Sequence, residues 1–248
     1  AEDLGLILFS TPFDKSAVDF LEDMNLPAYK IASCEITDIP LIEYIASKGK
    51  PVIISTGIAT YSDIKEAITA CRKSSNSQIA ILKCTSAYPT PPDEVNLTAI
   101  PYLKNKFKTV VGLSDHTMGT HISIASIALG AKIIERHFIL DRKLGGPDSI
   151  FSLEPKEFAQ MVKAIRDVEL ALGDAKRELT ENAKKSRDFA RSIFVVSDVK
   201  KGEVFTDKNI RSIRPGYGLP PKYLKDILGK KTKRYVRKGT PLNWDVII

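Results

Sequence analysis

The sequence predicts an α/β fold built on a parallel sheet, followed by a smaller unit of short strands and turns. Up to about residue 172, short and continuously apolar runs alternate with amphipathic segments. Unbroken apolar runs are typical of strands that are covered on both faces. This alternation implies parallel strands joined by right-handed helical crossovers. After Gly173 the pattern changes to charged residues, turns and short β-like runs, which indicates a second unit.

Six apolar runs are the expected strands of the first unit, and helical segments separate them. The strands are expected at residues 6–9, 28–31, 51–54, 79–82, 110–113 and 131–134, and the helices at 16–24, 39–47, 62–72, 97–105 and 121–129. A further helix has the clearest pattern, with apolar residues at helical spacing: Phe158, Met161, Val162, Ile165 and Val168. Pro155 near its first turn and Gly173 after its end fit helix-terminus preferences.

The expected domain organisation is a first unit at 1–175, a charged and partly helical linker at 176–188, and a second unit at 189–248. Residues 192–196 are a strand candidate in this second unit. With about 60 residues, the unit is near the lower limit for independent folding, so we expect it to lean on the first unit or on a partner chain.

Composition excludes several classes of protein. The chain of 248 residues has no apolar stretch long enough for a membrane span and does not open with a signal peptide. Its three cysteines lack metal-ligand spacing, so we expect free thiols and a cytoplasmic protein. The net charge of +7 lies largely late in the chain. No aromatic residues interleave the basic ones in the manner of an RNA-binding sheet, so we expect no nucleic acid partner.

Every expected strand ends in small hydroxyl or ionisable side chains. In chain order these are Ser10 and Thr11; Lys30, Ser33 and Glu35; Ser55 and Thr56; Lys83, Thr85, Ser86 and Tyr88; Ser114, Asp115 and His116; and Glu135 and His137. In parallel α/β folds the ligand site lies outside the carboxyl ends of the strands. Six polar strand ends in succession therefore predict the active site of an enzyme.

The residue types indicate the chemistry. Hydroxyls and lysines gathered at the carboxyl ends of the strands favour the binding of a phosphate group. His116 and His137, on neighbouring strand tips, form a plausible half-site for a divalent metal; the alternative is two structural histidines. A phosphate pocket beside a Lewis acid suits the joining of a phosphorylated carbon unit to an aldehyde. Two alternatives remain for Lys83, a Schiff-base aldolase through its amine and a lysine that only neutralises a carboxylate.

Several motifs together resemble the sialic acid synthase family, the phosphoenolpyruvate-condensing enzymes that make nonulosonic acids. They are STPF at 10–13, YKIASCE at 29–35, STG at 55–57, CTSAYP at 84–89, GLSDHT at 112–117, ERHF at 135–138, GGPD at 145–148 and RPGYG at 214–218. The resemblance implies a TIM-type (β/α) barrel and a small antifreeze-like β-clip (SAF) domain. The family's first two barrel strands have no counterpart here, so we expect strands three to eight only and an inactive chain when it is alone.

The resemblance also implies roles for individual residues. His116 and His137 would bind the metal, usually Mn²⁺ with Mg²⁺ or Co²⁺ as alternatives, and would share the catalytic role with Glu35. The phosphoenolpyruvate pocket would comprise Thr11, Lys30, Ser33, Ser55 and Ser114. Tyr88 and Asp148 match positions near the sugar, and Ser86 replaces an asparagine of the sialic acid branch. In a domain-swapped homodimer, Arg214 would contact the acylated amino sugar bound by the other subunit.

Residues 34–39 and 212–221 resemble the pseudaminic acid synthase branch of the family. That branch condenses phosphoenolpyruvate with a 2,4-diacetamido-2,4,6-trideoxy sugar of altrose configuration. Three alternatives remain: a synthase of N-acetylneuraminate or a related sialic acid that uses N-acetylmannosamine, the aldolase through Lys83, and a sugar- or ice-binding protein without enzymatic activity.

Overall fold

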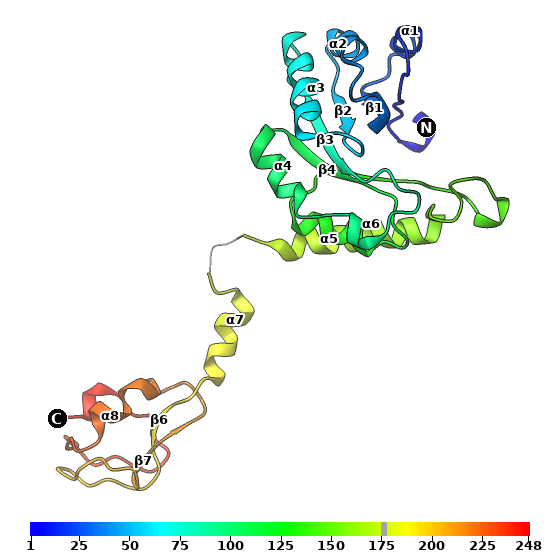
Figure 1. Cartoon of the computed structure of the whole chain (residues 1–248). Coiled ribbons are helices and arrows are strands. Elements are labelled where there is room, and N and C mark those ends of the chain that lie inside the picture. Colours follow the sequence, from blue (N-terminus) through cyan, green and yellow to red (C-terminus); the bar gives the residue numbers. More distant parts are fainter. Residues whose placement is uncertain (175–177) are drawn as a thin grey trace. The chain divides into compact units, whose positions relative to one another are not determined.

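The computed structural model describes residues 1–174 and 178–248, which fall into two compact units, 1–173 and 174–248 (Figure 1). Each unit has its own hydrophobic core, so each is described by itself. The expected boundary at 175/176, where the linker begins, lies outside the described residues. None of the helices formed by the described residues is both long enough and apolar enough to cross a bilayer.

Unit 1 contains one sheet of five parallel strands whose spatial order follows the chain. The strands are β1 (Tyr29–Ile31), β2 (Val52–Ser55), β3 (Ile79–Cys84), β4 (Val110–Asp115) and β5 (Ile134–Arg136). Each strand pairs with the next one along the chain, as in a (β/α) barrel. The register places Cys84 opposite Ser114 and Ser114 opposite Glu135, so the polar strand ends lie together at one edge.

Six α-helices alternate with these strands. They are α1 (Lys15–Asp23), α2 (Ile39–Ser47), α3 (Tyr61–Lys73), α4 (Ala99–Phe107), α5 (His121–Ala128) and α6 (Pro155–Leu172). The five helices that were predicted with both bounds begin and end within two residues of those bounds. Local capping explains several starts: the side chains of Asp14, Asp38 and Thr60 each accept a backbone N–H of the first turn. In Figure 1, α1, α2 and α3 lie beside one another along β1–β3, and α5 packs against α6.

Two strand predictions were wrong in position. Residues 6–9 form no strand, because the segment joins the sheet only at Ser10, whose carbonyl accepts the N–H of Lys30 at 3.0 Å. One bridge does not make a ladder, and Ile7 is 78% exposed. The last strand is β5 at Ile134–Arg136 rather than 131–134. It continues past the apolar run because its polar side chains meet polar partners on β4, as described below.

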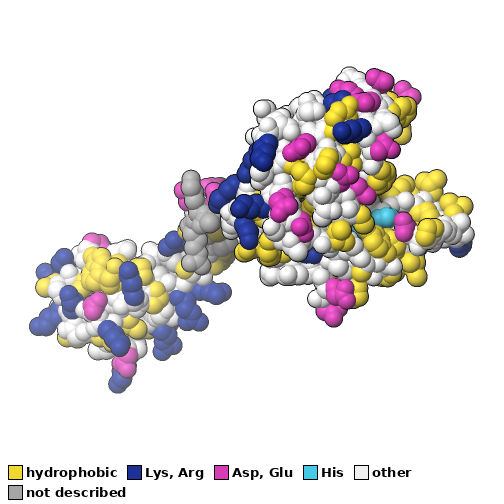
Figure 2. Space-filling view, turned by 45° about the horizontal axis from the view of Figure 1, so that its top comes forward, with side chains coloured by type: hydrophobic (Ala, Val, Ile, Leu, Met, Phe, Trp, Pro, Cys, Tyr) yellow, Lys and Arg dark blue, Asp and Glu magenta, His cyan; other side chains and the backbone are white. Residues whose placement is uncertain are grey.

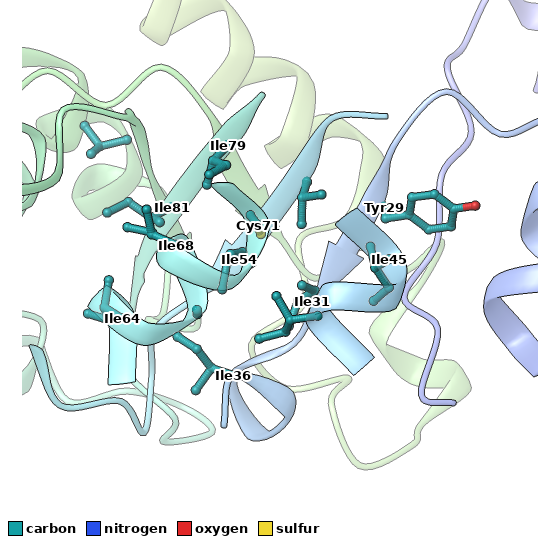
Figure 3. Packing of buried hydrophobic residues seen from close by; sticks show 14 of the residues in the cluster. Tyr29, Ile31, Ile36, Ile45, Ile54, Ile64, Ile68, Cys71, Ile79 and Ile81 are labelled. Atoms are coloured by element: carbon teal, nitrogen blue, oxygen red, sulfur yellow. The ribbon is translucent and has the colours of Figure 1, made fainter. Parts of the chain in front are cut away.

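The core of unit 1 lies between the sheet and its helices (Figure 3). Ile31, Ile54 and Ile81 from three neighbouring strands pack against helix residues that include Ile45 and Ile68. Burial also raises the pKa of the Cys71 thiol to about 11, which keeps it protonated in this apolar setting. As expected, the three cysteines are free thiols: Cys34, Cys71 and Cys84.

Unit 2 is a small β-rich fold. It contains the antiparallel strands β6 (Ser192–Val195) and β7 (Ile210–Ile213), with helices α7 (Glu181–Ser186) and α8 (Leu224–Ile227). Isolated bridges, including Val199 with Val236, tie its turns together over a core that contains Phe205 and Ile227. Short 3-10 turns complete the two units: Glu2–Leu4, Ser33–Glu35, Pro92–Glu94, Arg142–Leu144, Arg187–Phe189, Pro221–Tyr223 and Trp244–Val246. Lys and Arg side chains are spread over the face of unit 2 seen in Figure 2.

The packing of β3 gives a testable expectation for stability. Replacing Ile81, which is fully buried, with alanine should lower the free energy of unfolding of unit 1 by about 2–5 kcal/mol, because a cavity remains where the side chain was. The matched control is Ile58→Ala, since Ile58 is 53% exposed and should change that free energy by no more than about 0.5 kcal/mol. Urea unfolding monitored by circular dichroism would measure both. Equal effects of the two substitutions would contradict the assignment of this core.

Candidate active site at the strand ends

A group of hydrogen-bonded polar side chains lies inside the curved sheet and is centred on Lys30. The Lys30 Nζ donates to Ser55 Oγ at 2.7 Å and lies 3.6 Å from Glu135 Oε2. Glu135 Oε1 in turn accepts the hydroxyl of Ser114 at 2.6 Å. These four side chains come from β1, β2, β4 and β5, so the interior of the sheet brings together residues from both of its ends. We call them the interior polar group.

Lys30 is only 6% exposed, and its burial has an electrostatic cost. Desolvation lowers the pKa of Lys30, while the nearby Glu135 carboxylate opposes this shift. The Glu135 carboxylate and the Ser55 hydroxyl therefore lie against an amine that has little contact with water, and the Ser114 hydroxyl binds the same carboxylate. This arrangement can receive an anionic ligand, because the hydroxyls can turn to donate and the amine supplies positive charge.

The loops that follow β1, β2 and β3 meet closely at Gly57. The Gly57 N–H donates to Ser33 Oγ at 3.0 Å. A Cβ atom at this position would lie 2.1 Å from Ser86 Oγ and 2.8 Å from Ser33 Oγ, so no larger residue fits without movement of these loops. Glu35 is nearby in sequence, and its buried Oε2 has no hydrogen-bond partner among the described residues. Such an atom is costly to bury and is a candidate to contact a ligand.

The two histidines lie next to each other beyond the interior polar group, with ring centroids 5.2 Å apart. His116 Nδ1 lies 3.2 Å from the carbonyl oxygen of Thr85, and His137 Nδ1 lies 3.4 Å from Asp148 Oδ2. Each Nδ1–H can donate to its oxygen, which leaves Nε2 as the atom with a free lone pair. Burial lowers the pKa of both histidines, so both are neutral at neutral pH.

These features fit a divalent metal with two protein ligands. Two neutral imidazoles with an oriented Nδ1–H are the form of histidine that binds metals. Within residues 1–174 and 178–248, no group of three or more His, Cys, Asp or Glu side chains is arranged to hold a metal ion. The chain could therefore supply two ligands, and the remaining coordination positions would be open to water and substrate.

Aromatic rings surround the histidine pair. The ring of Tyr88 lies 4.3 Å from that of His116, and the ring of Phe151 lies 4.9 Å from that of His137. Phe151 is only 2% exposed, so its ring is held by the surrounding protein. Tyr88 is 53% exposed, so its ring is accessible to a ligand. Partial burial raises the pKa of Tyr88, so it remains a neutral phenol. The rings limit the directions from which a substrate can approach the two Nε2 atoms.

Thr11 and Lys83, both candidates in the sequence analysis, lie apart from the interior polar group. Thr11 is half-buried and makes no hydrogen bond to that group within the described part of the chain. Arg214 belongs to unit 2, where it is exposed directly after β7. Lys83 donates to the carbonyl of Cys84 at 2.7 Å and to Thr85 Oγ1 at 2.8 Å. Lys83 also lines a separate pocket of about 320 Å³, together with residues at the N-terminal ends of α3 and α4 such as Tyr61 and Ala99.

Glu135 and Asp115 were predicted only as polar strand ends without a role of their own, and neither Arg136 nor Phe151 was predicted as a site residue. The first three follow apolar runs, and their positions in register on β4 and β5 were the available signal: Ser114 pairs with Glu135 and Asp115 with Arg136. No local pattern marked Phe151. Its position depends on the return of the chain after the loop that carries Asp148, where Leu153 N–H donates to the carbonyl of His137.

Comparisons with known proteins were consistent with these features. Residues 1–177 match the NeuB family and residues 190–247 match the SAF domain. The chain is 45% identical to a pseudaminic acid synthase of Helicobacter pylori over 248 residues, which covers 100% of this chain and 73% of that protein. A pseudaminic acid synthase of Campylobacter jejuni strain 81-176 is 45% identical over 242 residues, 98% of this chain and 71% of the relative. The crystal structure of the Bacillus subtilis spore coat polysaccharide biosynthesis protein SpsE superposes with a TM-score of 0.67 at 37% identity, covering 100% and 75% of the two chains.

The lowered pKa values of the two histidines predict a pH dependence of stability. Between the ordinary value of 6.5 and the lower folded values, the unfolded chain binds more protons than the folded one. Stability should therefore be complete above pH 6.5 and fall as the pH drops through this window. Thermal unfolding of the metal-free protein at pH 7.0 and 5.5 would measure the loss. The double substitution His116→Ala/His137→Ala should reduce that loss; an unchanged loss would contradict the assignment.

Proposed function

The chain belongs to the NeuB family, and we propose that it condenses phosphoenolpyruvate with a 2,4-diacetamido-2,4,6-trideoxy sugar of altrose configuration to give pseudaminic acid and phosphate. The 45% identity to pseudaminic acid synthases over the whole chain supports this substrate pair. The structural observation that carries the proposal is a buried polar group around Lys30 whose members Ser114 and Glu135 stand two residues before the two paired histidines. An anion pocket and a metal half-site are the two parts that this reaction requires.

The interior polar group would hold the phosphate and carboxylate of phosphoenolpyruvate. Lys30 supplies the positive charge, and Ser55 and Ser114 reorient their hydroxyls toward the ligand. Ser33, held by the Gly57 N–H, and Thr11 would complete this pocket. Because the amine is largely removed from water, its attraction for an anion is stronger than that of a surface lysine.

His116 and His137 would hold the divalent metal through Nε2, with Mn²⁺ as the first choice and Mg²⁺ and Co²⁺ as alternatives. Such a metal supplies Lewis acidity to the aldehyde oxygen of the open-chain sugar. Thr85 and Asp148 keep both imidazoles in the orientation that exposes Nε2. Tyr88 and Phe151 limit the sugar to one approach, and Ser86 and Asp148 border the space that the sugar would occupy.

In the reaction, C3 of phosphoenolpyruvate forms a bond to the aldehyde carbon, and positive charge develops at C2. Water adds at C2, and phosphate leaves with cleavage of its C–O bond. Glu35 has a carboxylate oxygen without a protein partner, so it can stabilise the charge at C2 or accept the proton of the added water. Loss of phosphate makes the condensation effectively irreversible.

We further propose that the active form is a cytoplasmic, domain-swapped homodimer in which Arg214 contacts the sugar bound by the other subunit. The alternative within the same family is a synthase that uses N-acetylmannosamine. The Schiff-base alternative is less well supported, because Lys83 lies in the pocket beside α3 and α4 rather than in the interior polar group. Family membership leaves the sugar- or ice-binding alternative without support.

An assay of phosphate release would test the reaction. A protein that contains this chain should release phosphate from phosphoenolpyruvate and Mn²⁺ with the 2,4-diacetamido sugar of altrose configuration, at least ten times faster than with N-acetylmannosamine at equal concentration. EDTA and the His116→Ala substitution should each abolish the release. Preference for N-acetylmannosamine would transfer the assignment to the sialic acid branch. Full activity in His116→Ala would contradict the metal site.

The two strand lysines provide a matched pair of variants. Lys30→Met should lower kcat/KM for phosphoenolpyruvate about 10- to 100-fold, since a hydrogen bond to a charged group is worth about 1.5–3 kcal/mol. Lys83→Met removes a half-buried strand lysine that lies on the helix side of the sheet, and it should change this value less than about twofold. Steady-state kinetics of both variants would compare the positions. A larger loss in Lys83→Met, together with trapping by borohydride, would favour the aldolase.

A further inference from the structure

We propose that the buried ion pair between Asp115 and Arg136 is the positioning element that sets the distance and orientation of His116 and His137. The inference rests on the proposed function in one respect, that the two histidines are the metal ligands. Neither residue of the pair contacts the interior polar group, and neither was given a role of its own in the predicted site.

The register of β4 and β5 places each histidine next to one partner of the ion pair. Ser114 lies opposite Glu135, and Asp115 lies opposite Arg136. The residue that follows each partner of the ion pair is a histidine, His116 after Asp115 and His137 after Arg136. Side chains alternate between the two faces of a strand. The Ser114–Glu135 contact lies in the interior, so the Asp115–Arg136 contact lies on the helix side, and the two histidines follow on the interior side. Each histidine is thus the direct chain neighbour of one partner of the ion pair.

Asp115 makes contacts that hold the segment around His116. Its Oδ1 accepts the backbone N–H of Thr117 at 2.9 Å, and its Oδ2 accepts the Ser123 hydroxyl at 2.5 Å. The same Oδ2 lies 2.9 Å from Arg136 Nη1, and both side chains of the pair are 1% exposed. One carboxylate therefore fixes the backbone on both sides of His116 and attaches it to α5.

Arg136 makes contacts with the segments beside both histidines. Its Nη2 donates to the carbonyl of Thr117 at 2.9 Å and to that of Phe151 at 3.3 Å. Thr117 directly follows His116, and the ring of Phe151 packs against the ring of His137. The guanidinium thereby links Thr117, which is next to His116, with Phe151, which packs against His137.

Energetics favour a role in geometry over a role in stability alone. A buried ion pair is weak evidence for stability, because removing both charges from water costs about as much as their attraction returns. Here the hydrogen bonds of the pair go to Thr117, Ser123 and Phe151, all of which adjoin or support the histidine-bearing segments. Replacing either partner should therefore shift the imidazoles even in a protein that remains folded.

The test combines metal affinity with a readout that needs no metal. Asp115→Asn keeps the shape of the side chain but removes the charge that faces Arg136. We expect it to weaken Mn²⁺ binding, measured by electron paramagnetic resonance of free Mn²⁺, about 10- to 100-fold. In long-range ¹H–¹⁵N spectra of the metal-free protein, the imidazole signals of His116 and His137 should shift, whereas that of His121, which is exposed, should not.

One further variant controls for a general loss of stability, and another serves as a replacement for Asp115→Asn. Ile165→Ala destabilises the buried face of α6, which packs against α5, and should leave Mn²⁺ affinity within about twofold of the parent protein. If Asp115→Asn does not fold, Ser123→Ala replaces it, because it removes one hydrogen bond to Asp115 Oδ2 and should weaken Mn²⁺ binding in the same direction by a smaller factor.

The outcomes separate the two proposals. Parent-like Mn²⁺ affinity and unshifted imidazole signals in Asp115→Asn would overturn the positioning role, as would an equal loss of affinity in Ile165→Ala. A parent protein that binds no Mn²⁺, or whose affinity survives His116→Ala, would overturn the metal site of the proposed function. In that case the imidazole signals of the metal-free protein still decide whether the ion pair positions the two rings.

Discussion

The contact between Lys30 and Glu135 constrains the whole of unit 1. These residues lie on the first and the last strand of the sheet, yet their charged atoms are 3.6 Å apart. In a flat sheet, β1 and β5 would be about 19 Å apart at the usual spacing of neighbouring strands, beyond the reach of both side chains. The contact therefore requires a strongly curved sheet with its polar strand ends turned toward a common interior.

Curvature of this kind explains why unusual residues are tolerated inside the sheet. A buried lysine and a partly buried glutamate are costly unless each is paired. The interior polar group satisfies Lys30 with Ser55 and Glu135, and satisfies Glu135 with Ser114. On the opposite face of β4 and β5, Asp115 and Arg136 form a buried ion pair. The two histidines lie beyond both sets of contacts, so their surroundings are determined from both faces of the sheet.

Much of unit 1 could be predicted from the sequence, because its strands and helices have strong local patterns. The helices fell within two residues of their predicted bounds because their apolar residues recur at helical spacing. Residues 6–9 show the limit of this approach: an apolar run forms a strand only where a neighbouring strand pairs with it. β5 shows the opposite error, a strand that continues beyond its apolar run. Glu135 and Arg136 belong to it because they pair with β4, and no local sequence pattern indicates this pairing.

The predicted site residues divide in the same way. Lys30, Ser55, Ser114, His116 and His137 were predicted from strand ends, and the structure brings them together. Lys83 has the same local signal but points to the helix side, because the direction of a side chain depends on the register of its strand and not on its residue type. Phe151 became part of the site only through the path of a loop. Contacts between distant segments therefore decide which polar strand ends share a pocket.

The order of the strands has a consequence for folding. Each strand pairs with the next along the chain, so the sheet can grow from one strand–helix unit to the next through contacts of short sequence separation. The Lys30–Glu135 contact differs, since it joins the two ends of the sheet and closes a very long loop of chain, at an entropic cost that grows with loop length. Binding competence should therefore appear late in folding, after most of the secondary structure has formed. Ligand binding would then report on the completed fold more faithfully than helix content.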